Sequence, residues 1–141
     1  MVAKLKARIK KNEGYSKIPY KDTLGFYTIG YGHLIKKNEE FYFKKKFKKK
    51  DFDVLFEDDF NNAYKNYINH FSHPKHTNKD KELLTEMIFQ LGAKGLFKFK
   101  KMLHYVNNKQ KYMACLEMMN SLWYLQTPKR VENLIYNYIR K

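Results

Sequence analysis

Cysteine is nearly absent from this sequence, and glycine and proline are scarce. The single cysteine, Cys115, excludes a disulfide framework and a cysteine-ligated metal site, and its helical apolar surroundings predict a buried, unreactive thiol. Only six glycines and three prolines occur, and no stretch is rich in glycine, serine or proline, so no flexible linker is expected. The 141 residues therefore predict one domain, or one unit of two lobes, over 1–141.

Long apolar runs are also missing. No stretch reaches the roughly 20 residues that a membrane-spanning helix needs. The basic start, residues 1–11, is not followed by an apolar run of signal-peptide length. We therefore expect a chain that is made and folded in a cytoplasm, and that another agent must release if it acts outside the cell.

Acidic residues are few, with 14 against 29 basic residues and a net charge of +15. Only Arg8, Arg130 and Arg140 are arginines, so the surplus is lysine, which attracts polyanions at long range without bidentate geometry. Nucleic acid, anionic membrane and anionic cell wall all fit this charge. The segment 41–50 interleaves aromatics with lysines, as some single-stranded nucleic-acid grooves do, although a solvated surface is the commoner outcome. Its secondary structure stays open.

Aromatic residues are abundant, at 17%, and 43% of the chain is hydrophobic, which is ample for a core. Apolar residues at helical spacing predict a helix over 1–13, ended by Gly14, and a longer one over 52–71. Between them, short β-prone pieces flank a turn at 22–25. Further helical stripes follow over 72–141. The pattern predicts an α+β, mainly helical fold: a small lobe with a short β-hairpin sheet over about 14–51, a long connecting helix, and a helical C-terminal lobe.

Two acids stand at the ends of the first elements. Glu13 closes the first helix, where the negative end of the helix dipole disfavours a second negative charge. Asp22 lies in a polar turn and should stay ionised, and Thr28 on the returning strand can hold water beside it. An acid that keeps its proton and an ionised partner are what glycoside hydrolysis requires. On spacing alone, a lysine pair for Glu13 and an Asx-turn for Asp22 are the commoner outcome.

Three blocks of motifs, in order along the chain, favour the catalytic interpretation of Glu13 and Asp22 over the structural one. They are Glu13-Gly14 with Tyr20-Lys21-Asp22-Thr23, Gly25, Tyr27-Thr28-Ile29-Gly30 and Gly32-His33-Leu34; Phe89-Gln90-Leu91-Gly92; and Trp123-Tyr124 with Gln126-Thr127-Pro128 and Arg130. Together they span nearly the whole chain. They resemble the signature of the phage-type lysozymes, whose familiar member is the T-even phage endolysin.

The resemblance implies a two-lobed lysozyme-like fold, with the helix over 1–13 packing on the C-terminal lobe. It implies a muramidase that needs no cofactor or metal, with Glu13 as acid, Asp22 as the base that positions water, and Thr28 as the third catalytic partner. The chain departs from the family by being shorter than expected between His33 and Leu55, and by ending soon after Arg130.

The resemblance also implies supporting and substrate-binding residues. Arg130 matches an arginine that pairs with the catalytic Glu, and His33 matches a histidine bridged to an acid on the connecting helix, here Asp59. Gln90 matches a cleft residue. Gly30 and Leu34, from the first block, complete the predicted substrate-binding set.

The sequence therefore predicts an endolysin-type lysozyme that hydrolyses, with inversion, the bond between N-acetylmuramic acid and N-acetylglucosamine for host cell lysis. Peptidoglycan is the expected partner, with no nucleic acid, and the chain is expected to be a monomer. It would accumulate in the host cytoplasm and reach the wall or periplasm after a holin opens the membrane. The alternatives are an inactive wall-binding or tail-structural module and a cationic membrane-active protein.

Two further features have ordinary interpretations. His70, His73 and His76 have metal-ligand spacing but no acid or cysteine completes a set, so an exposed loop is expected. Trp123 could stack on sugar, but its place beside the Thr127-Pro128 helix start favours the core.

Overall fold

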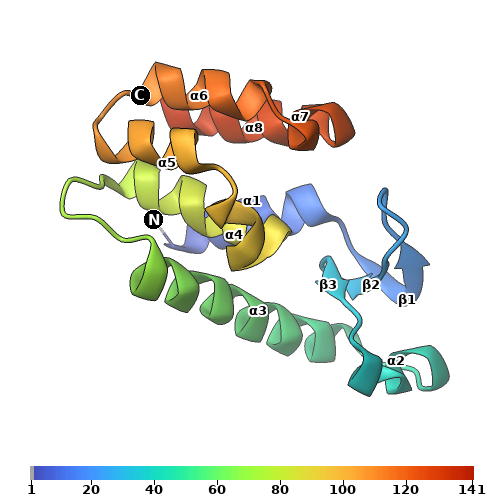
Figure 1. Cartoon of the computed structure of the whole chain (residues 1–141). Helices are drawn as coiled ribbons and strands as arrows, with labels where there is room; N and C mark the ends of the chain where they lie inside the picture. Colours follow the sequence, from blue (N-terminus) through green and yellow to red (C-terminus); the bar gives the residue numbers. More distant parts are fainter. Residues whose placement is uncertain (1) are drawn as a thin grey trace. The chain divides into compact units, whose positions relative to one another are not determined.

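The computed structural model describes residues 2–141, and it divides into two compact units, one ending at Asn62 and the other beginning at Ala63. A small three-stranded antiparallel sheet lies in the first unit, and the second is entirely helical in its described secondary structure. The predicted α+β, mainly helical fold is therefore confirmed (Figure 1). The lobe bounds and the packing of the first helix on the C-terminal lobe stay predictions. Within residues 2–141, no helix combines the length and apolarity needed to cross a bilayer.

The first unit begins with a helix and a sheet joined by Gly14. Gly14 has φ +73°, and its N–H donates to the carbonyl of Lys10 at 3.0 Å, which ends the helix in the left-handed conformation that glycine favours. The strands follow one another in the order β1-β2-β3. The bounds are α1 Val2–Glu13, β1 Ser16–Lys21, β2 Tyr27–Gly30 and β3 His33–Leu34.

The segment whose structure the sequence left open folds into short helices. A 3-10 turn, η1 (Lys37–Glu39), and one helical turn, α2 (Phe41–Lys44), lead into the long helix α3 (Lys49–His70). Helix α3 begins three residues before the predicted start because the Asp51 carboxylate accepts from the free N–H of Lys48 at 2.8 Å. Most of its predicted stripe is buried, namely Phe52, Phe56, Phe60, Ala63, Tyr67 and Phe71, whereas Ile68, which was predicted on the same face, is exposed.

The second unit is built from the end of α3 and five further helices. Helix α4 starts at a capping box in which the N–H of Asp80 donates to the Thr77 hydroxyl and the N–H of Thr77 donates to Asp80. The cap is therefore Thr77. Gly92, at φ +75°, kinks the helix, whereas Gly95 does not interrupt it. The bounds are α4 Asn78–Phe97, α5 Lys100–Asn107, α6 Lys111–Met119, α7 Leu122–Gln126 and α8 Pro128–Ile139.

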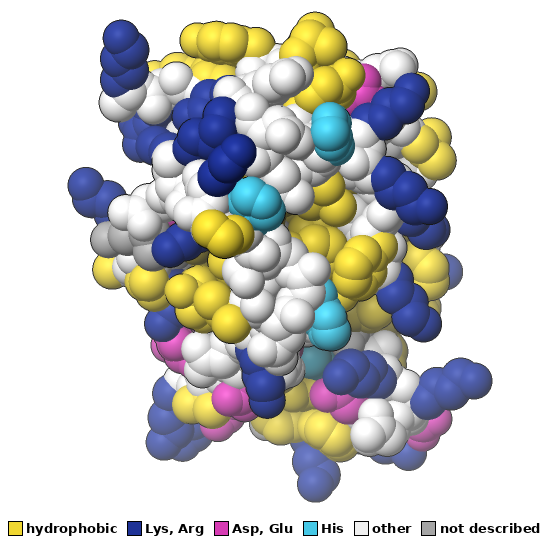
Figure 2. Space-filling model, turned by 60° about the vertical axis from the view of Figure 1, so that its left-hand side comes forward, with side chains coloured by type: hydrophobic (Ala, Val, Ile, Leu, Met, Phe, Trp, Pro, Cys, Tyr) yellow, Lys and Arg dark blue, Asp and Glu magenta, His cyan; other side chains and the backbone are white. Residues whose placement is uncertain are grey.

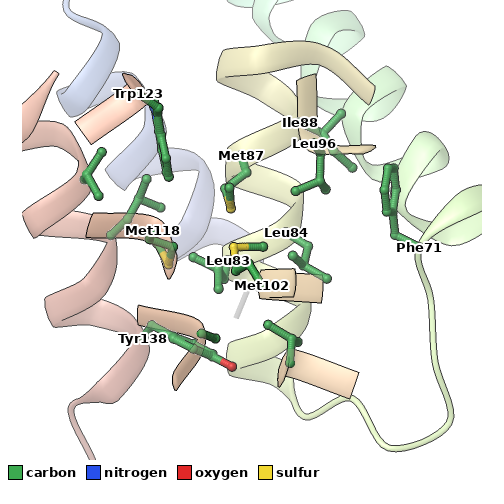
Figure 3. Packing of buried hydrophobic residues seen from close by; sticks show 14 of the residues in the cluster. Phe71, Leu83, Leu84, Met87, Ile88, Leu96, Met102, Met118, Trp123 and Tyr138 are labelled. Atoms are coloured by element: carbon green, nitrogen blue, oxygen red, sulfur yellow. The ribbon is translucent and has the colours of Figure 1, made fainter. Parts of the chain in front are cut away.

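The core of the second unit lies where α4 meets α5, α6 and α8 (Figure 3). Met87, Met102 and Met118 converge on it with Leu84, and Trp123 is buried at its side, as predicted. Methionine side chains are flexible and can fill irregular gaps between packed helices. Cys115 is buried in the same cluster, and burial raises the pKa of its thiol, which keeps it unreactive.

A hydrogen-bonded chain of polar groups links the elements of the second unit. The Tyr67 hydroxyl lies 2.6 Å from His76 Nδ1, and His76 Nε2 lies 2.7 Å from Asn107 Oδ1. Burial raises the pKa of Tyr67 to about 12 and lowers the pKa of His76, which keeps both groups neutral. The expectation of an exposed histidine loop is therefore wrong for His76, which joins α3 to the end of α5.

Candidate active site

Glu13 is held at the end of α1 by the backbone that surrounds it. The side chain is half buried. A Cβ added at Gly32, in the turn between β2 and β3, would collide with Glu13 Oε2 and Cδ. Gly32 has φ +74°, so glycine is also the residue that its backbone favours. The carboxylate of Glu13 therefore lies directly against the turn of the sheet, and the absence of a side chain at Gly32 makes that position available.

Asp22 is fixed at the end of β1 by its own turn. Its Oδ1 accepts from the N–H groups of Leu24 and Phe26, both at 2.9 Å. The backbone closes the turn, because Asp22 N donates to the Phe26 carbonyl at 2.8 Å and Gly25 N donates to the Asp22 carbonyl at 3.0 Å. The predicted Asx-turn is thus present. Because both bonds fall on Oδ1, the carboxylate is oriented while Oδ2 remains for water or a substrate hydroxyl.

Thr28 lies on β2, beside the strand that leads to Asp22. Thr28 pairs with Tyr20 across β1 and β2, and Asp22 follows directly after the end of β1 at Lys21. The Thr28 side chain is buried and its hydroxyl donates to the Tyr20 carbonyl at 3.3 Å. Its oxygen can therefore accept a hydrogen from a water molecule held near Asp22.

The two substrate-binding candidates of the sheet have different surroundings. Leu34 pairs with Thr28 across β2 and β3 and is half exposed, so it extends the same face of the sheet with apolar surface. Gly30 is buried, with φ +65°, and a Cβ there would come within 2.8 Å of the Phe52 ring. The structure gives Gly30 a packing role against α3, and its predicted contact with substrate stays a prediction.

His33 is held between two carboxylates. Its Nδ1 lies 2.8 Å from Asp59 Oδ2 on α3, the predicted contact. Its Nε2 lies 3.0 and 3.2 Å from the two oxygens of Glu39, which the sequence analysis did not identify. The Glu39 carboxylate also accepts from the N–H of Lys36 at 2.9 Å. An ionised carboxylate can only accept hydrogen bonds, so protonated His33 donates from both ring nitrogens and ties β3 to η1 and α3.

The pKa values of His33 and Glu39 are shifted in opposite directions by this cluster. Burial alone would lower the pKa of His33, but hydrogen bonds and charge from Asp59 and Glu39 outweigh it and raise the pKa. Burial would raise the pKa of Glu39, but the Lys36 N–H and His33 outweigh it and lower the pKa. The stability that His33 contributes is therefore present below its unfolded pKa of about 6.5 and lost as pH rises through the folded value. The contribution of Glu39 is lost as pH falls through its own folded value.

NMR titration of the His33 ring should therefore give a midpoint above that of an unfolded histidine. Asp59→Asn and Glu39→Gln should each lower this midpoint, because each removes a negative partner. Glu40→Gln is the matched control, since Glu40 is an exposed neighbour paired only with Lys44 in the described contacts. A midpoint that is unchanged in both cluster variants would remove the ion pairs from this account.

Arg130 and Gln90 lie in the second unit. Arg130 Nε is 3.8 Å from Oε2 of Glu86, a carboxylate that is completely buried on α4. Glu86 was not identified from the sequence, because it falls outside the apolar stripe of α4 and no local motif marks it. Gln90 is half buried, two residues before the kink at Gly92. The pairing of Arg130 with Glu13 and the placing of Gln90 in a cleft stay predictions.

Two anchored carboxylates, one on a helix end and one on a hairpin, are the groups that the class of glycoside hydrolases requires. The comparisons with known proteins are more specific. The family model described as "Phage lysozyme" matches residues 10–136. "Probable T4-type lysozyme 2" of Dictyostelium discoideum is 36% identical over 158 aligned residues, covering 96% of this chain and 93% of the relative. "Probable T4-type lysozyme 1" of the same organism is 32% identical with the same coverage.

The chain belongs to the phage lysozyme family. The resemblance inferred from the motifs is confirmed, and the protein is a glycoside hydrolase that acts on peptidoglycan.

Proposed function

We propose that the protein hydrolyses the glycosidic bond between N-acetylmuramic acid and N-acetylglucosamine with inversion at the anomeric carbon. The observation that supports this best is the anchoring of Glu13 and Asp22 on separate elements of the first unit, in a chain of this family. Cleavage of an acetal needs a proton for the departing oxygen and a base for the attacking water.

Each residue has one role in the proposed step. Glu13 gives its proton to the leaving sugar oxygen as the bond to the anomeric carbon breaks. Asp22 takes a proton from a water molecule whose oxygen attacks that carbon from the opposite face, and Thr28 holds this water. Glu13 ends ionised and Asp22 protonated, and a proton passes through solvent to restore both. Arg130 is proposed to temper the acidity of Glu13, and Gln90 to contact the substrate.

The stereochemistry tests this step directly. NMR of the fresh product from a soluble peptidoglycan oligosaccharide should show the anomer opposite to the linkage that was cleaved, before mutarotation mixes the two. An initial product with the configuration of the substrate would overturn the single-displacement scheme, because it would require a covalent intermediate.

We propose a phage endolysin as the biological setting: a monomer that accumulates in the host cytoplasm and reaches the wall through a holin. The description of the family model supports a phage role. The two Dictyostelium discoideum relatives support a second setting, in which a cellular organism uses the same reaction. Expression in bacteria with and without a holin distinguishes them, because an endolysin should clear the culture only when the holin is present.

Two rival functions need different experiments. An inactive wall-binding or tail-structural module would bind peptidoglycan but leave its turbidity unchanged. A cationic protein that lyses cells by charge alone would keep its effect in Glu13→Gln, whereas hydrolysis would not.

The lysine surface should govern association with intact walls and not the chemistry. Figure 2 shows Lys and Arg side chains distributed over the face in view, with few acids between them. Exposed charges are screened beyond about 8 Å at physiological ionic strength, so activity on walls should fall as salt rises. Activity on a short soluble oligosaccharide should fall much less.

The sharpest form of this experiment neutralises the lysine cluster at the end of α2 and the start of α3, namely Lys44, Lys45, Lys46, Lys48, Lys49 and Lys50. This variant should lose wall binding in low salt, as wild type does in high salt, and keep its rate on the oligosaccharide. Equal salt dependence on both substrates would show that the lysines act on the reaction itself.

A further inference from the structure

Helices α6 and α7 carry an exposed apolar stripe. On α6, the solvent face presents Tyr112, Met113, Leu116 and Met119, and on α7 it presents Leu122 and Leu125. The largest exposed fractions are 72% for Tyr112, 68% for Leu122 and 76% for Leu125. Positions 112, 116 and 119 lie at intervals of four and three and therefore share one face of α6, and positions 122 and 125 are three apart and share one face of α7.

This stripe is not explained by the core. The opposite face of the same segment already supplies Ala114, Cys115, Met118 and Trp123 to the buried cluster of the second unit. A helix that is apolar on both faces is normally covered on both. Contiguous exposed apolar side chains on a soluble protein usually mark a surface that binds a partner.

The charge of the segment that contains the stripe indicates the kind of partner. Between residues 94 and 130, Glu117 is the only acid, whereas eight residues are basic: Lys94, Lys98, Lys100, Lys101, Lys109, Lys111, Lys129 and Arg130. Of these, Lys109, Lys111 and Arg130 contact groups of the second unit. An apolar line in a basic segment matches the interface of an anionic lipid bilayer, where leucine and tyrosine side chains enter the headgroup boundary and lysines face acidic lipids. A second copy of this chain would bring another +15 charge and is disfavoured electrostatically.

We infer that the α6–α7 stripe is a docking surface for anionic lipid membranes. Leu122 and Leu125 enter the bilayer interface first, because they are the most exposed leucines of the line, and Tyr112 and Leu116 follow. Figure 1 shows α6 and α7 along the upper edge of the helical unit. All residues of the stripe belong to the second unit, whereas Glu13 and Asp22 belong to the first.

The experiment is co-sedimentation with vesicles of equal parts phosphatidylglycerol and phosphatidylcholine, and with vesicles of phosphatidylcholine alone. The variants are Leu122→Gln/Leu125→Gln on α7 and Tyr112→Gln/Leu116→Gln on α6. The matched control is Val54→Gln, which removes a 63% exposed apolar side chain from α3. Circular dichroism and hydrolysis of a soluble oligosaccharide show that each variant is folded, and analytical ultracentrifugation reports self-association.

Wild type should partition onto the anionic vesicles and bind the neutral ones far less. Each stripe variant should lose about tenfold or more in partitioning, which is the scale set by withdrawing one leucine from an apolar environment. Val54→Gln should bind like wild type. The inference is overturned if both stripe variants bind like wild type, since lysine charge would then suffice. It is also overturned if wild type binds neither kind of vesicle, or if the stripe variants abolish a dimer instead of lipid binding.

Discussion

Glu13→Gln is expected to lower turnover of peptidoglycan about 10²–10⁴-fold while leaving the protein folded. Glutamine keeps the shape of the side chain against Gly32 but has no proton to give to the leaving oxygen. Asp22→Asn should also lose most activity, because an amide cannot take a proton from the attacking water. Initial rates of turbidity loss on purified walls measure both effects, and reducing-end release from a soluble oligosaccharide measures them without the contribution of wall binding.

The matched control for this prediction is Glu40→Gln. Glu40 is an exposed acid whose described ion pair is a 4.0 Å contact with Lys44, so its removal changes the net charge by the same amount as Glu13→Gln. Its activity should equal that of wild type. If Glu13→Gln clears walls at a rate close to that of Glu40→Gln, Glu13 is not the acid and the assignment of the whole site is wrong.

Asp80→Ala is expected to lower the free energy of unfolding of the second unit by about 3 kcal/mol or more. The Asp80 carboxylate is 3% exposed. It accepts from Tyr138 Oη at 2.6 Å and from the N–H and hydroxyl of Thr77 at 2.8 and 3.0 Å, and Lys109 Nζ lies 3.9 Å away. Hydrogen bonds to a charged group contribute about 1.5–3 kcal/mol each, and alanine leaves the buried Tyr138 hydroxyl without its acceptor.

Urea unfolding followed by the fluorescence of Trp123, the only tryptophan of the chain, measures this loss, because Trp123 is buried in the same unit. Tyr138→Phe removes one bond of the network and should cost less than Asp80→Ala. Asp58→Ala, at an exposed position of α3, should leave the midpoint close to that of wild type. A shared midpoint for Asp80→Ala and Asp58→Ala would show that the network does not stabilise the fold.

The main elements could be predicted because their signals are local. Burial of Phe52, Phe56, Phe60 and Tyr67 along α3 follows from their three- and four-residue spacing, since such side chains must lie on one face of a helix. The end of α1 follows from Gly14, which alone favours the left-handed conformation found there. The anchoring of Asp22 follows equally from its turn, because an Asx-turn is formed by neighbouring residues.

Most of the parts that escaped prediction depend on contacts between different elements of the fold. Glu39 was missed because its hydrogen bond to His33 depends on the position of η1 beside that residue, and no hydrophobic periodicity in the sequence predicts this position. Glu86 was missed because its partner Arg130 is on another helix. His76 was taken for a solvated loop residue, since its partners Tyr67 and Asn107 come from two helices that only the folded chain brings together. Thr127 is the N-cap of α8 and Pro128 follows it, as predicted, but the Thr127 hydroxyl makes no capping hydrogen bond because it donates to the Trp123 carbonyl.

The close approach of Gly32 to Glu13 means that the site is partly defined by a missing side chain. The Cβ of any other residue at position 32 would occupy space that the Glu13 carboxylate now fills. A relative that retained both acids but carried a bulkier residue at this turn would match the family by its charged residues while its acid pointed elsewhere. Whether such a relative is active is therefore better judged from the two acids together with the residue at the position of Gly32 than from the acids alone.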